Sequence, residues 1–398
     1  MYGSALVLVA LCLAGVCFAG AGARAAGWET PRGNAHATGV AQGPGPVDPV
    51  IAWQERWRGG AFAPPVAADG TVFMARDAVG GSAVTALDLT SGDTEWEHRI
   101  GAPVCGLSVA DGVVYAVSEP GALVLLDAQT GRVRGEFTAP GNLPPPGSPW
   151  APVPLVGADV VVPLRDAVLA LRAGVTEPLW TWSRPPSEPA QHWLTGPVSV
   201  TRGGHVLVST SSGCLFALSG IDGSVQWRFQ AGGEGIPVAA AVDSRDHVYS
   251  VASPQAFRGI LACVDAPTGR ALWLRDLPRH AWVPPAATDE AVVVLDMDGR
   301  LSCFGAGTGE PQWETTLPSG EGPRGLPSAP VIDSEGRVYA AMGQTTLCCG
   351  LDNGEELFRR EMDEGICIEH VILPGGGSLL VTFQDGTICC LRDPEADG

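Results

Sequence analysis

An eleven-residue segment that recurs along the 398-residue chain constrains the fold more than any other feature of the sequence. Each clear copy begins with a small residue, has glycine at its seventh position and ends in tryptophan. The clear copies are Ala86–Trp96 (ALDLTSGDTEW), Ala217–Trp227 (ALSGIDGSVQW), Cys263–Trp273 (CVDAPTGRALW) and Cys303–Trp313 (CFGAGTGEPQW). Weaker copies are Leu125–Phe137, Ala170–Trp180 and Gly350–Phe358. A segment that recurs in this way indicates a single repeat architecture, because unrelated domains would not share the segment.

The residue types in the segment predict a β-hairpin. Apolar residues form the first strand, and a turn with glycine follows, since glycine takes a positive φ that a side chain resists. The chain then returns as a second strand that carries the tryptophan. We expect the small first residue to leave room for the indole of a neighbouring repeat, and each buried indole to stabilise the fold by a few kcal/mol. The predicted docking residues are Trp96, Trp180, Trp227, Trp273 and Trp313.

A second hairpin upstream of each copy completes a unit of four strands. Two examples are GLSVADGVVYAV from Gly106 and APVIDSEGRVYAA from Ala329, each a strand, a polar turn and a second strand. Successive tryptophans lie 47 residues apart between Trp180 and Trp227, and 46 apart between Trp227 and Trp273. A four-stranded unit with this period is a propeller blade.

The number of units predicts how the ring closes. Seven returning strands are visible, and after Phe358 the chain has residues for only three more, which end near Leu391. The stretch Val50–Trp57 supplies the missing outer strand, so no long strand edge is left open. The sequence therefore predicts an all-β fold, an eight-bladed β-propeller of four-stranded antiparallel blades over residues 50–392, closed by an N-terminal outer strand.

The first residues predict an export signal. Ala5–Ala19 is almost wholly apolar, and Ala23-Arg24-Ala25 is typical of a cleavage site. We expect residues 1–25 to be a signal peptide, which makes the protein periplasmic or extracellular. Two alternatives stay open: a membrane anchor, for which the apolar run is short, and lipidation at a cysteine. The remaining predicted regions are an N-terminal extension, 26–49, and a C-terminal tail, 393–398.

Charge and cysteine content narrow the function classes. The chain has 24 basic residues, all of them arginine, against 43 acidic ones, and a net charge of −19. Phosphate backbones would repel it, which argues against nucleic acid as a partner. Removal of the signal peptide leaves nine of the 11 cysteines, an odd number that cannot pair completely. Cys263, Cys303 and Cys390 stand at the first position of the segment, so we expect small buried residues there.

The hairpin segment resembles the tryptophan-docking motif of the PQQ-like, or quinoprotein-type, β-propeller repeat family. The stretch from Trp28 through Arg32-Gly33-Asn34 to Gly39, followed by Trp53, is similar to the entry segment of such proteins. The resemblance covers about residues 28–392. In size and blade number the chain is also similar to BamB, an outer-membrane assembly lipoprotein that docks on a larger machine. The same blades occur in enzymes and in scaffolds, so the motifs are specific for the fold alone.

The enzymes of the quinoprotein family imply a calcium site with Glu, Asn and Asp ligands, a catalytic Asp and a vicinal disulfide beside the quinone. No such set can be mapped onto this sequence, because the only asparagines are Asn34, Asn142 and Asn353. The adjacent pairs Cys348-Cys349 and Cys389-Cys390 lie in predicted strands, where neighbouring side chains point to opposite faces. We expect no catalytic residue, no metal site and no cofactor, with PQQ and Ca²⁺ as the alternative.

Aromatic residues precede the proline that opens the first strand of several blades. Ionisable residues lie beside them or in comparable segments of the last two blades, and the first strand of a blade runs beside the central axis. These residues are therefore predicted to line one mouth of the funnel as a site for a protein partner or a small ligand, the alternative being packing between blades. The set comprises Phe62, Trp150, His192, Trp193, His280, Trp282, Arg324, Glu369 and His370.

Three functions follow from these observations. The first is an exported, non-catalytic binding scaffold, monomeric and associated with the membrane through a partner, such as a subunit of an envelope protein assembly. The second is a periplasmic PQQ-dependent oxidoreductase or sensor. The third is a propeller that binds carbohydrate or another polymer through the aromatic rim.

Overall fold

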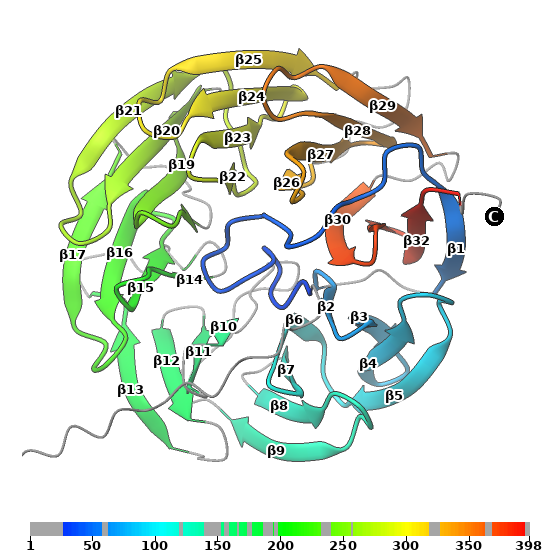
Figure 1. Ribbon diagram of the computed structural model, residues 1–398. Coiled ribbons are helices and arrows are strands. Elements are labelled where there is room, and N and C mark those ends of the chain that lie inside the picture. Colours follow the sequence, from blue (N-terminus) through cyan, green and yellow to red (C-terminus); the bar gives the residue numbers. More distant parts are fainter. Residues whose placement is uncertain are drawn as a thin grey trace, which may run out of the picture.

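The computed structural model describes residues 27–57, 63–118, 122–138, 153–154, 159–164, 167–172, 177–185, 194, 198–231, 240–255, 258–317, 327–362 and 368–394. These residues form 32 strands in eight four-stranded antiparallel sheets arranged as blades around a central axis (Figure 1). The predicted signal peptide and most of the C-terminal tail lie outside the described residues. No helix long and apolar enough to cross a bilayer occurs in the part of the chain that the structure describes.

The first four blades follow one another along the chain. Blade 1 has β2 (Val66–Ala68), β3 (Thr71–Ala78), β4 (Gly81–Asp88) and β5 (Thr94–Ile100); blade 2 has β6 (Val104–Ala110), β7 (Val113–Ser118), β8 (Ala122–Asp127) and β9 (Val133–Thr138); blade 3 has β10 (Val153–Pro154), β11 (Asp159–Pro163), β12 (Ala167–Arg172) and β13 (Pro178–Ser183); blade 4 has β14 (Ser199–Val200), β15 (His205–Ser209), β16 (Cys214–Ser219) and β17 (Val225–Gln230).

The last four blades continue in the same order. Blade 5 has β18 (Ala241–Val242), β19 (His247–Gln255), β20 (Arg258–Asp265) and β21 (Ala271–Leu277); blade 6 has β22 (Ala286–Ala287), β23 (Ala291–Leu295), β24 (Arg300–Gly305) and β25 (Pro311–Thr316); blade 7 has β26 (Val331–Ile332), β27 (Arg337–Met342), β28 (Thr345–Gly350) and β29 (Glu356–Glu361); blade 8 has β30 (Ile368–Gly375), β31 (Ser378–Phe383), β32 (Thr387–Arg392) and β1 (Val50–Arg56).

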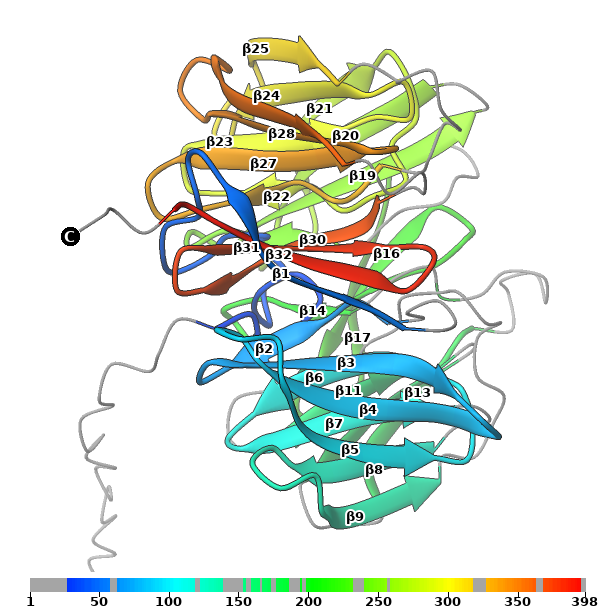
Figure 2. The ribbon, with the colours of Figure 1, turned by 90° about the vertical axis from the view of Figure 1, so that its right-hand side faces the viewer.

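The predicted closure of the ring is confirmed. β1 pairs antiparallel with β32, and Val50 lies opposite Arg392 while Gln54 lies opposite Cys389. Figure 2 shows the N-terminal strand beside the last strand on the outside of blade 8. The first and last strands of the chain thus belong to one sheet, and the eight-bladed count made from the sequence holds.

The tryptophans dock between blades, but not where the sequence suggested. The residue at the first position, such as Ala86, lies directly opposite the tryptophan of its own blade. The neighbouring indole sits instead on the glycine at the seventh position of the following blade, where an added Cβ would lie 2.5 to 2.7 Å from the indole ring. Glycine is therefore required at this position for two reasons: the indole leaves no room for a Cβ, and the backbone has a positive φ. The pairs are Trp53–Gly92, Trp96–Gly131, Trp180–Gly223, Trp227–Gly269, Trp273–Gly309 and Trp313–Gly354. In blade 7 the positions count from Cys348, which lies opposite Phe358.

A hydrogen bond fixes each docked indole. In every pair the indole Nε1 donates to the carbonyl of the fourth position of the next blade's segment, at 2.6 to 2.9 Å. Trp53 makes the same bond to Leu89, so it is a sixth docking residue that the sequence pattern missed. Its hairpin cannot be recognised locally, because its partner strand β32 lies at the other end of the chain.

This geometry explains why two copies of the segment end in phenylalanine. Blades 2 and 7 carry Phe137 and Phe358 in place of tryptophan. Blade 3, which follows Phe137, has Thr176 at the seventh position of its segment. Blade 8, which follows Phe358, has no such turn, because β32 and β1 are not joined by a hairpin. Tryptophan is therefore present where the following blade offers a glycine turn, and absent where it does not.

The described cysteines are buried and form no disulfide. Cys263, Cys303 and Cys390 each lie opposite the tryptophan of their own blade, as their position in the segment indicates. Cys348 packs in the core that blade 7 shares with blade 8, whereas Cys349 packs in the core shared with blade 6. These two side chains therefore point to opposite faces of the sheet. Burial raises the pKa of both thiols to about 12.

Candidate functional site

Residues 27–47, which we call the axial loop, cross the centre of the propeller before the chain reaches β1 (Figure 1). Trp28 forms an antiparallel bridge with Ala67 of blade 1. Further backbone bonds of 2.8 or 2.9 Å connect the loop to the first strands of five more blades. The bonds join Glu29 to Val109, Ala35 to Val200, His36 to Val242, Thr38 to Ala287 and Gly39 to Ile332.

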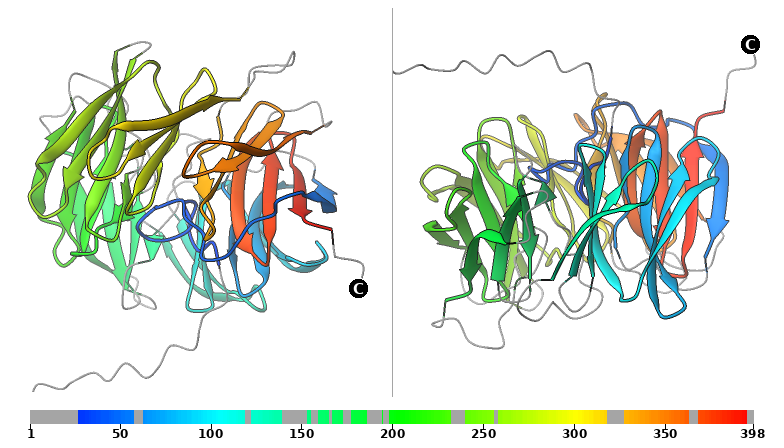
Figure 3. Two further views of the ribbon diagram at one scale, coloured as in Figure 1. Left: turned by 45° about the horizontal axis from the view of Figure 1, so that its top comes forward. Right: turned by 90° about the horizontal axis from the view of Figure 1, so that it is seen from below.

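The loop lies at one defined end of the ring. Each blade residue that it contacts is at or next to the end of a first strand, beside the turn into the second strand. We call this end the turn face, and the opposite end, where the chain enters the first strands, the rim face. Figure 3 shows the loop in dark blue toward one end of the ring of blades. The protein's own chain thus crosses the axis at the turn face.

Asn34 organises the loop internally. Its Nδ2 donates to Thr38 Oγ1 at 2.7 Å, and its Oδ1 accepts from the backbone nitrogen of His36 at 3.0 Å. Thr30 Oγ1 donates to the Asn34 carbonyl at 2.8 Å. His36 Nδ1 lies 2.6 Å from the carbonyl of Val200, and burial lowers the pKa of this histidine. The loop is therefore held by side-chain bonds as well as by its backbone bonds to the blades.

Arg32 is the one charged side chain of the axial loop that is buried, with 5% of its surface exposed. Its Nη2 donates to the carbonyls of Pro285 at 3.1 Å and Pro330 at 2.8 Å. Its Nε has no hydrogen-bond partner, and no carboxylate of the described residues pairs with it. A side chain at Gly39 would collide with the guanidinium. Burial lowers the pKa of Arg32 to about 9.

The Arg32 side chain points from the axial loop toward the rim face. The loop backbone bonds to Ala287 and Ile332, at the turn-face ends of β22 and β26. The guanidinium instead reaches Pro285 and Pro330, which precede these strands. Two residues of strand span about 6.6 Å. The charge is therefore displaced from the loop toward the rim face.

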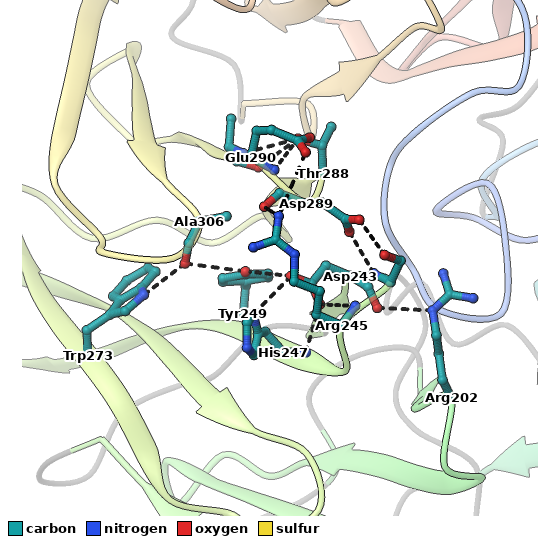
Figure 4. Close-up of polar contacts among 12 residues, drawn as sticks. Arg202, Asp243, Arg245, His247, Tyr249, Trp273, Thr288, Asp289, Glu290 and Ala306 are labelled. Atoms are coloured by element: carbon teal, nitrogen blue, oxygen red, sulfur yellow. Dashed lines mark hydrogen bonds and ion pairs between the residues drawn. The ribbon is translucent and has the colours of Figure 1, made fainter.

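A chain of hydrogen bonds joins the turns of blades 4, 5 and 6 beside the loop (Figure 4). Asp246 of blade 5 accepts from the backbone nitrogens of Arg202 at 2.7 Å and Gly203 at 3.0 Å in blade 4. Asp289 of blade 6 accepts from the backbone nitrogen of Ser244 in blade 5 at 2.9 Å and from its hydroxyl. Neighbouring blades are thereby fixed to one another at the turn face.

A buried aspartate supports the turn of blade 5. Asp243 accepts from the Tyr249 hydroxyl at 2.9 Å, from the backbone nitrogen of His247 at 2.8 Å, and lies 3.1 Å from His247 Nδ1 (Figure 4). Tyr249 also donates to the Ala306 carbonyl at 3.4 Å, which accepts from docked Trp273. Burial raises the pKa of the Tyr249 phenol.

Asp333 has the equivalent place in blade 7 and also holds the axial loop. It accepts from the Tyr339 hydroxyl at 3.1 Å and from Arg337 Nε at 2.7 Å. In addition, its Oδ2 accepts from the backbone nitrogen of Gly45 at 2.9 Å. Tyr339 donates to the carbonyl of Pro46 at 3.0 Å. The loop is therefore attached through side chains of blade 7 where it leaves the axis.

A cleft of 520 Å³ lies at the turn face between blades 1 and 2, where the axial loop begins. Its floor includes Phe73 and Val109. Arg134, which also lines it, pairs with Asp127. The remaining charged lining residues are acidic, so the cleft is negative; they are Glu29, Asp69, Glu95 and Asp111.

The structure describes part of the predicted rim. His280 and Trp282 lie together before β22, with ring centroids 5.0 Å apart, and Trp282 is 49% exposed. His370 lies in β30 of blade 8, where burial lowers its pKa to about 4. Glu369 is in the same strand, and its side chain is outside what the structure describes. The other predicted members also lie outside the described residues: Phe62, Trp150, His192, Trp193 and Arg324.

Comparison with known proteins places this geometry in a family. Residues 48–255 and 257–324 match the family model described as outer membrane protein assembly factor BamB. The chain belongs to the outer membrane protein assembly factor BamB family. A BamB of Burkholderia pseudomallei (strain K96243) is 25% identical over 362 residues, which are 86% of this chain and 89% of that protein. A BamB of Bordetella pertussis (strain Tohama I) is 25% identical over 266 residues, 64% of each chain.

Solved structures show the same fold outside the BamB family as well as within it. BamB from Moraxella catarrhalis has a TM-score of 0.67 and 17% identity, and the match covers 87% of this chain and all of that one. Quinohemoprotein alcohol dehydrogenase from Comamonas testosteroni has a TM-score of 0.68 and 14% identity, over 94% of this chain and 82% of that one. At these identities the likeness concerns the propeller alone.

The features of a quinoprotein centre fit the described residues of this BamB-family chain poorly. Asn34 is engaged within the axial loop, and Asn353 accepts from the backbone of Glu355 in a hairpin turn. The Cys348 and Cys349 side chains point to opposite faces. Within the described ranges, no group of three or more His, Cys, Asp or Glu residues could hold a metal ion.

Besides Trp53, sequence reasoning missed the role of Arg32. The sequence marks Trp28, Arg32 and Gly39 as part of an entry segment, but not as a loop that crosses the axis. Their contacts are mostly backbone bonds to blades far away in the sequence, which leave no periodic pattern. A lone arginine between Pro31 and Gly33, in a chain with no lysine, was the one available signal.

Proposed function

We propose that this chain is an exported, non-catalytic scaffold that acts in outer-membrane protein assembly through a protein partner. The observation that carries the proposal is the family match over most of the propeller, together with relatives named outer membrane protein assembly factor BamB. The match to the Burkholderia protein spans 89% of its length and 86% of this chain, so it covers most of both proteins. The proposal includes removal of residues 1–25 during export.

Two structural features support a scaffold role. The ring is closed by its own termini, and the turn face is cross-linked by the axial loop and by Asp246 and Asp289. A rigid body of this kind loses little entropy when it docks. At the rim face, half-exposed Trp282 offers an aromatic anchor of the type that dominates protein interfaces. We propose the rim face as the docking side.

The proposal gives no role to a quinone. Asn34 and the two described cysteine pairs are used in packing or in the loop, which is the support for that choice. Incubation of the purified protein with PQQ and Ca²⁺ should produce no stoichiometric chromophore and no thermal shift. A chromophore bound at one equivalent would instead favour the oxidoreductase or sensor.

Deletion of the gene in its native host tests the assembly role. The outer-membrane proteome is expected to lose several β-barrel proteins together, and the wild-type gene is expected to restore them. An unchanged outer-membrane proteome would overturn the proposal.

A pair of variants tests the docking side. Trp282→Ala should fail to restore the β-barrel proteins, whereas Leu272→Ala should restore them. The two side chains are similarly exposed, at 49% and 51%, but Leu272 lies on outer strand β21. Both variants should melt within about 2 °C of the wild type, because neither side chain is buried. Full restoration by Trp282→Ala would exclude this residue as an anchor.

A further inference from the structure

The charge of Arg32 is not balanced by a carboxylate of the residues that the structure describes. Buried arginines are normally paired with a carboxylate, because desolvation of a lone charge is costly. Elsewhere in this structure Arg337, with 13% of its side chain exposed, pairs with Asp333 at 2.7 Å. Arg76, at 27%, pairs with Glu97. Arg32 is buried more deeply than either and has no carboxylate partner among the described residues.

Only one of the three guanidinium nitrogens has acceptors. Nη2 donates to the carbonyls of Pro285 and Pro330. Nε is buried and has none, and no bond from Nη1 to the described residues is present. A guanidinium has five N–H groups, so three of them make no bond to the described residues. Two carbonyl dipoles replace only part of the hydration that an ion loses on burial.

Loss of the proton does not resolve the imbalance. Burial lowers the pKa of Arg32 to about 9, which still leaves the side chain charged at neutral pH. The electrostatic field of the whole protein does not attract an anion either, because the chain carries a net charge of −19. Only local contacts could therefore hold a compensating anion against this charge.

We propose that Arg32 binds a small monovalent anion, a halide or a carboxylate group, on the axis of the propeller through its Nε and Nη1 groups. The axial loop crosses the turn face and the guanidinium is displaced from it toward the rim face, so the proposal places the anion on the rim-face side of the loop. Charge-assisted N–H bonds to halide or carboxylate are the strong class of hydrogen bond, and no other cation competes for the ion among the residues of the axial loop. This inference does not depend on the role in assembly.

Thermal unfolding at constant ionic strength tests the site in solution. Sodium methanesulfonate, whose anion is larger, is replaced stepwise by sodium bromide or sodium formate. We expect a saturable rise in Tm for wild type, and a loss of at least about tenfold in apparent affinity for Arg32→Met, as expected for removal of a charge-assisted bond. Arg202→Met is the matched control, because Arg202 lies at the turn face and bonds to the Asp243 carbonyl. It should keep the wild-type response.

Crystals of wild type soaked in bromide keep the test decisive if Arg32→Met does not fold. The expected result is an anomalous peak in contact with Arg32 Nε or Nη1. A response to both anions identifies a general monovalent site, and a response to formate alone identifies a carboxylate site. Three results overturn the proposal: no response in wild type, the same response in Arg32→Met, or a peak without any response in solution, which would mean binding at crystal concentration only.

Discussion

Replacing Gly309 by alanine is expected to undock Trp273, whereas the same change at Gly307 should leave the indole in place. Both glycines lie in the turn between β24 and β25. At Gly309, where φ is +66°, an added Cβ would lie 2.5 Å from Trp273 Cε3 and 2.6 Å from Cδ2. At Gly307 it would meet no atom within 4 Å. The pair therefore separates docking from the general cost of alanine in this turn.

The magnitude follows from three contributions. A side chain at positive φ costs about 1 kcal/mol. Loss of the 2.9 Å bond from Trp273 Nε1 to the Ala306 carbonyl costs about 1 kcal/mol. Partial exposure of an indole that is now 8% exposed costs about 1–3 kcal/mol, less than the 3–5 kcal/mol of complete removal. We expect Gly309→Ala to lower the free energy of unfolding by about 3–5 kcal/mol, and Gly307→Ala by less than about 1 kcal/mol.

Urea unfolding of the two variants, followed by far-ultraviolet circular dichroism, measures this difference. Near-ultraviolet circular dichroism of the folded proteins reports the packing of the indole. If Gly309→Ala unfolds at the same urea concentration as Gly307→Ala, the indole does not rest on this glycine. The presence of phenylalanine in blades 2 and 7 would then need a different physical reason as well.

Two other predictions concern buried ionisable groups. Burial raises the pKa of Cys303 to about 12; the unfolded thiol ionises near pH 8.5, so stability should fall as the pH rises above that value, by about 1.4 kcal/mol per pH unit and thiol. Cys303→Ala should reduce this slope in urea titrations between pH 8 and 10.5, and an unchanged slope would count against the buried thiol. Asp333→Asn should cost about 3 kcal/mol and speed hydrogen exchange of the Gly45 amide, because it weakens the bonds to Gly45, Arg337 and Tyr339. Asp243→Asn should destabilise similarly without changing exchange of this amide, and equal effects of both variants on the Gly45 amide would contradict the attachment.

The blades could be predicted because their information is local. A glycine turn, two flanking strands and an aromatic residue recur within one hairpin, and the ring closure follows by counting strands. The docking place of the indole could not be derived in the same way. The glycine at the seventh position already had a reason to be there, its positive φ, and nothing in the sequence shows that it also receives a ring from another blade.

The candidate site was less predictable for a physical reason. The axial loop is fixed by backbone bonds to six blades, and backbone groups are the same for every sequence. Arg32 finds carbonyls of Pro285 and Pro330, about 250 and 300 residues away, so no spacing connects them. On the rim, the His280 and Trp282 rings lie 5.0 Å apart, and the binding site that they were predicted to form stays a prediction.

The pairing of β1 with β32 also sets the order in which the molecule can be completed. The N-terminal strand leaves the ribosome, and in our proposal crosses the membrane, long before its partner at residues 387–392 exists. The residues of seven other blades lie between it and its partner strand. The last hairpin is then the step that converts an open, protease-sensitive arc into a ring. A chain that stops a few residues early would therefore lose the whole ring closure and not merely one strand.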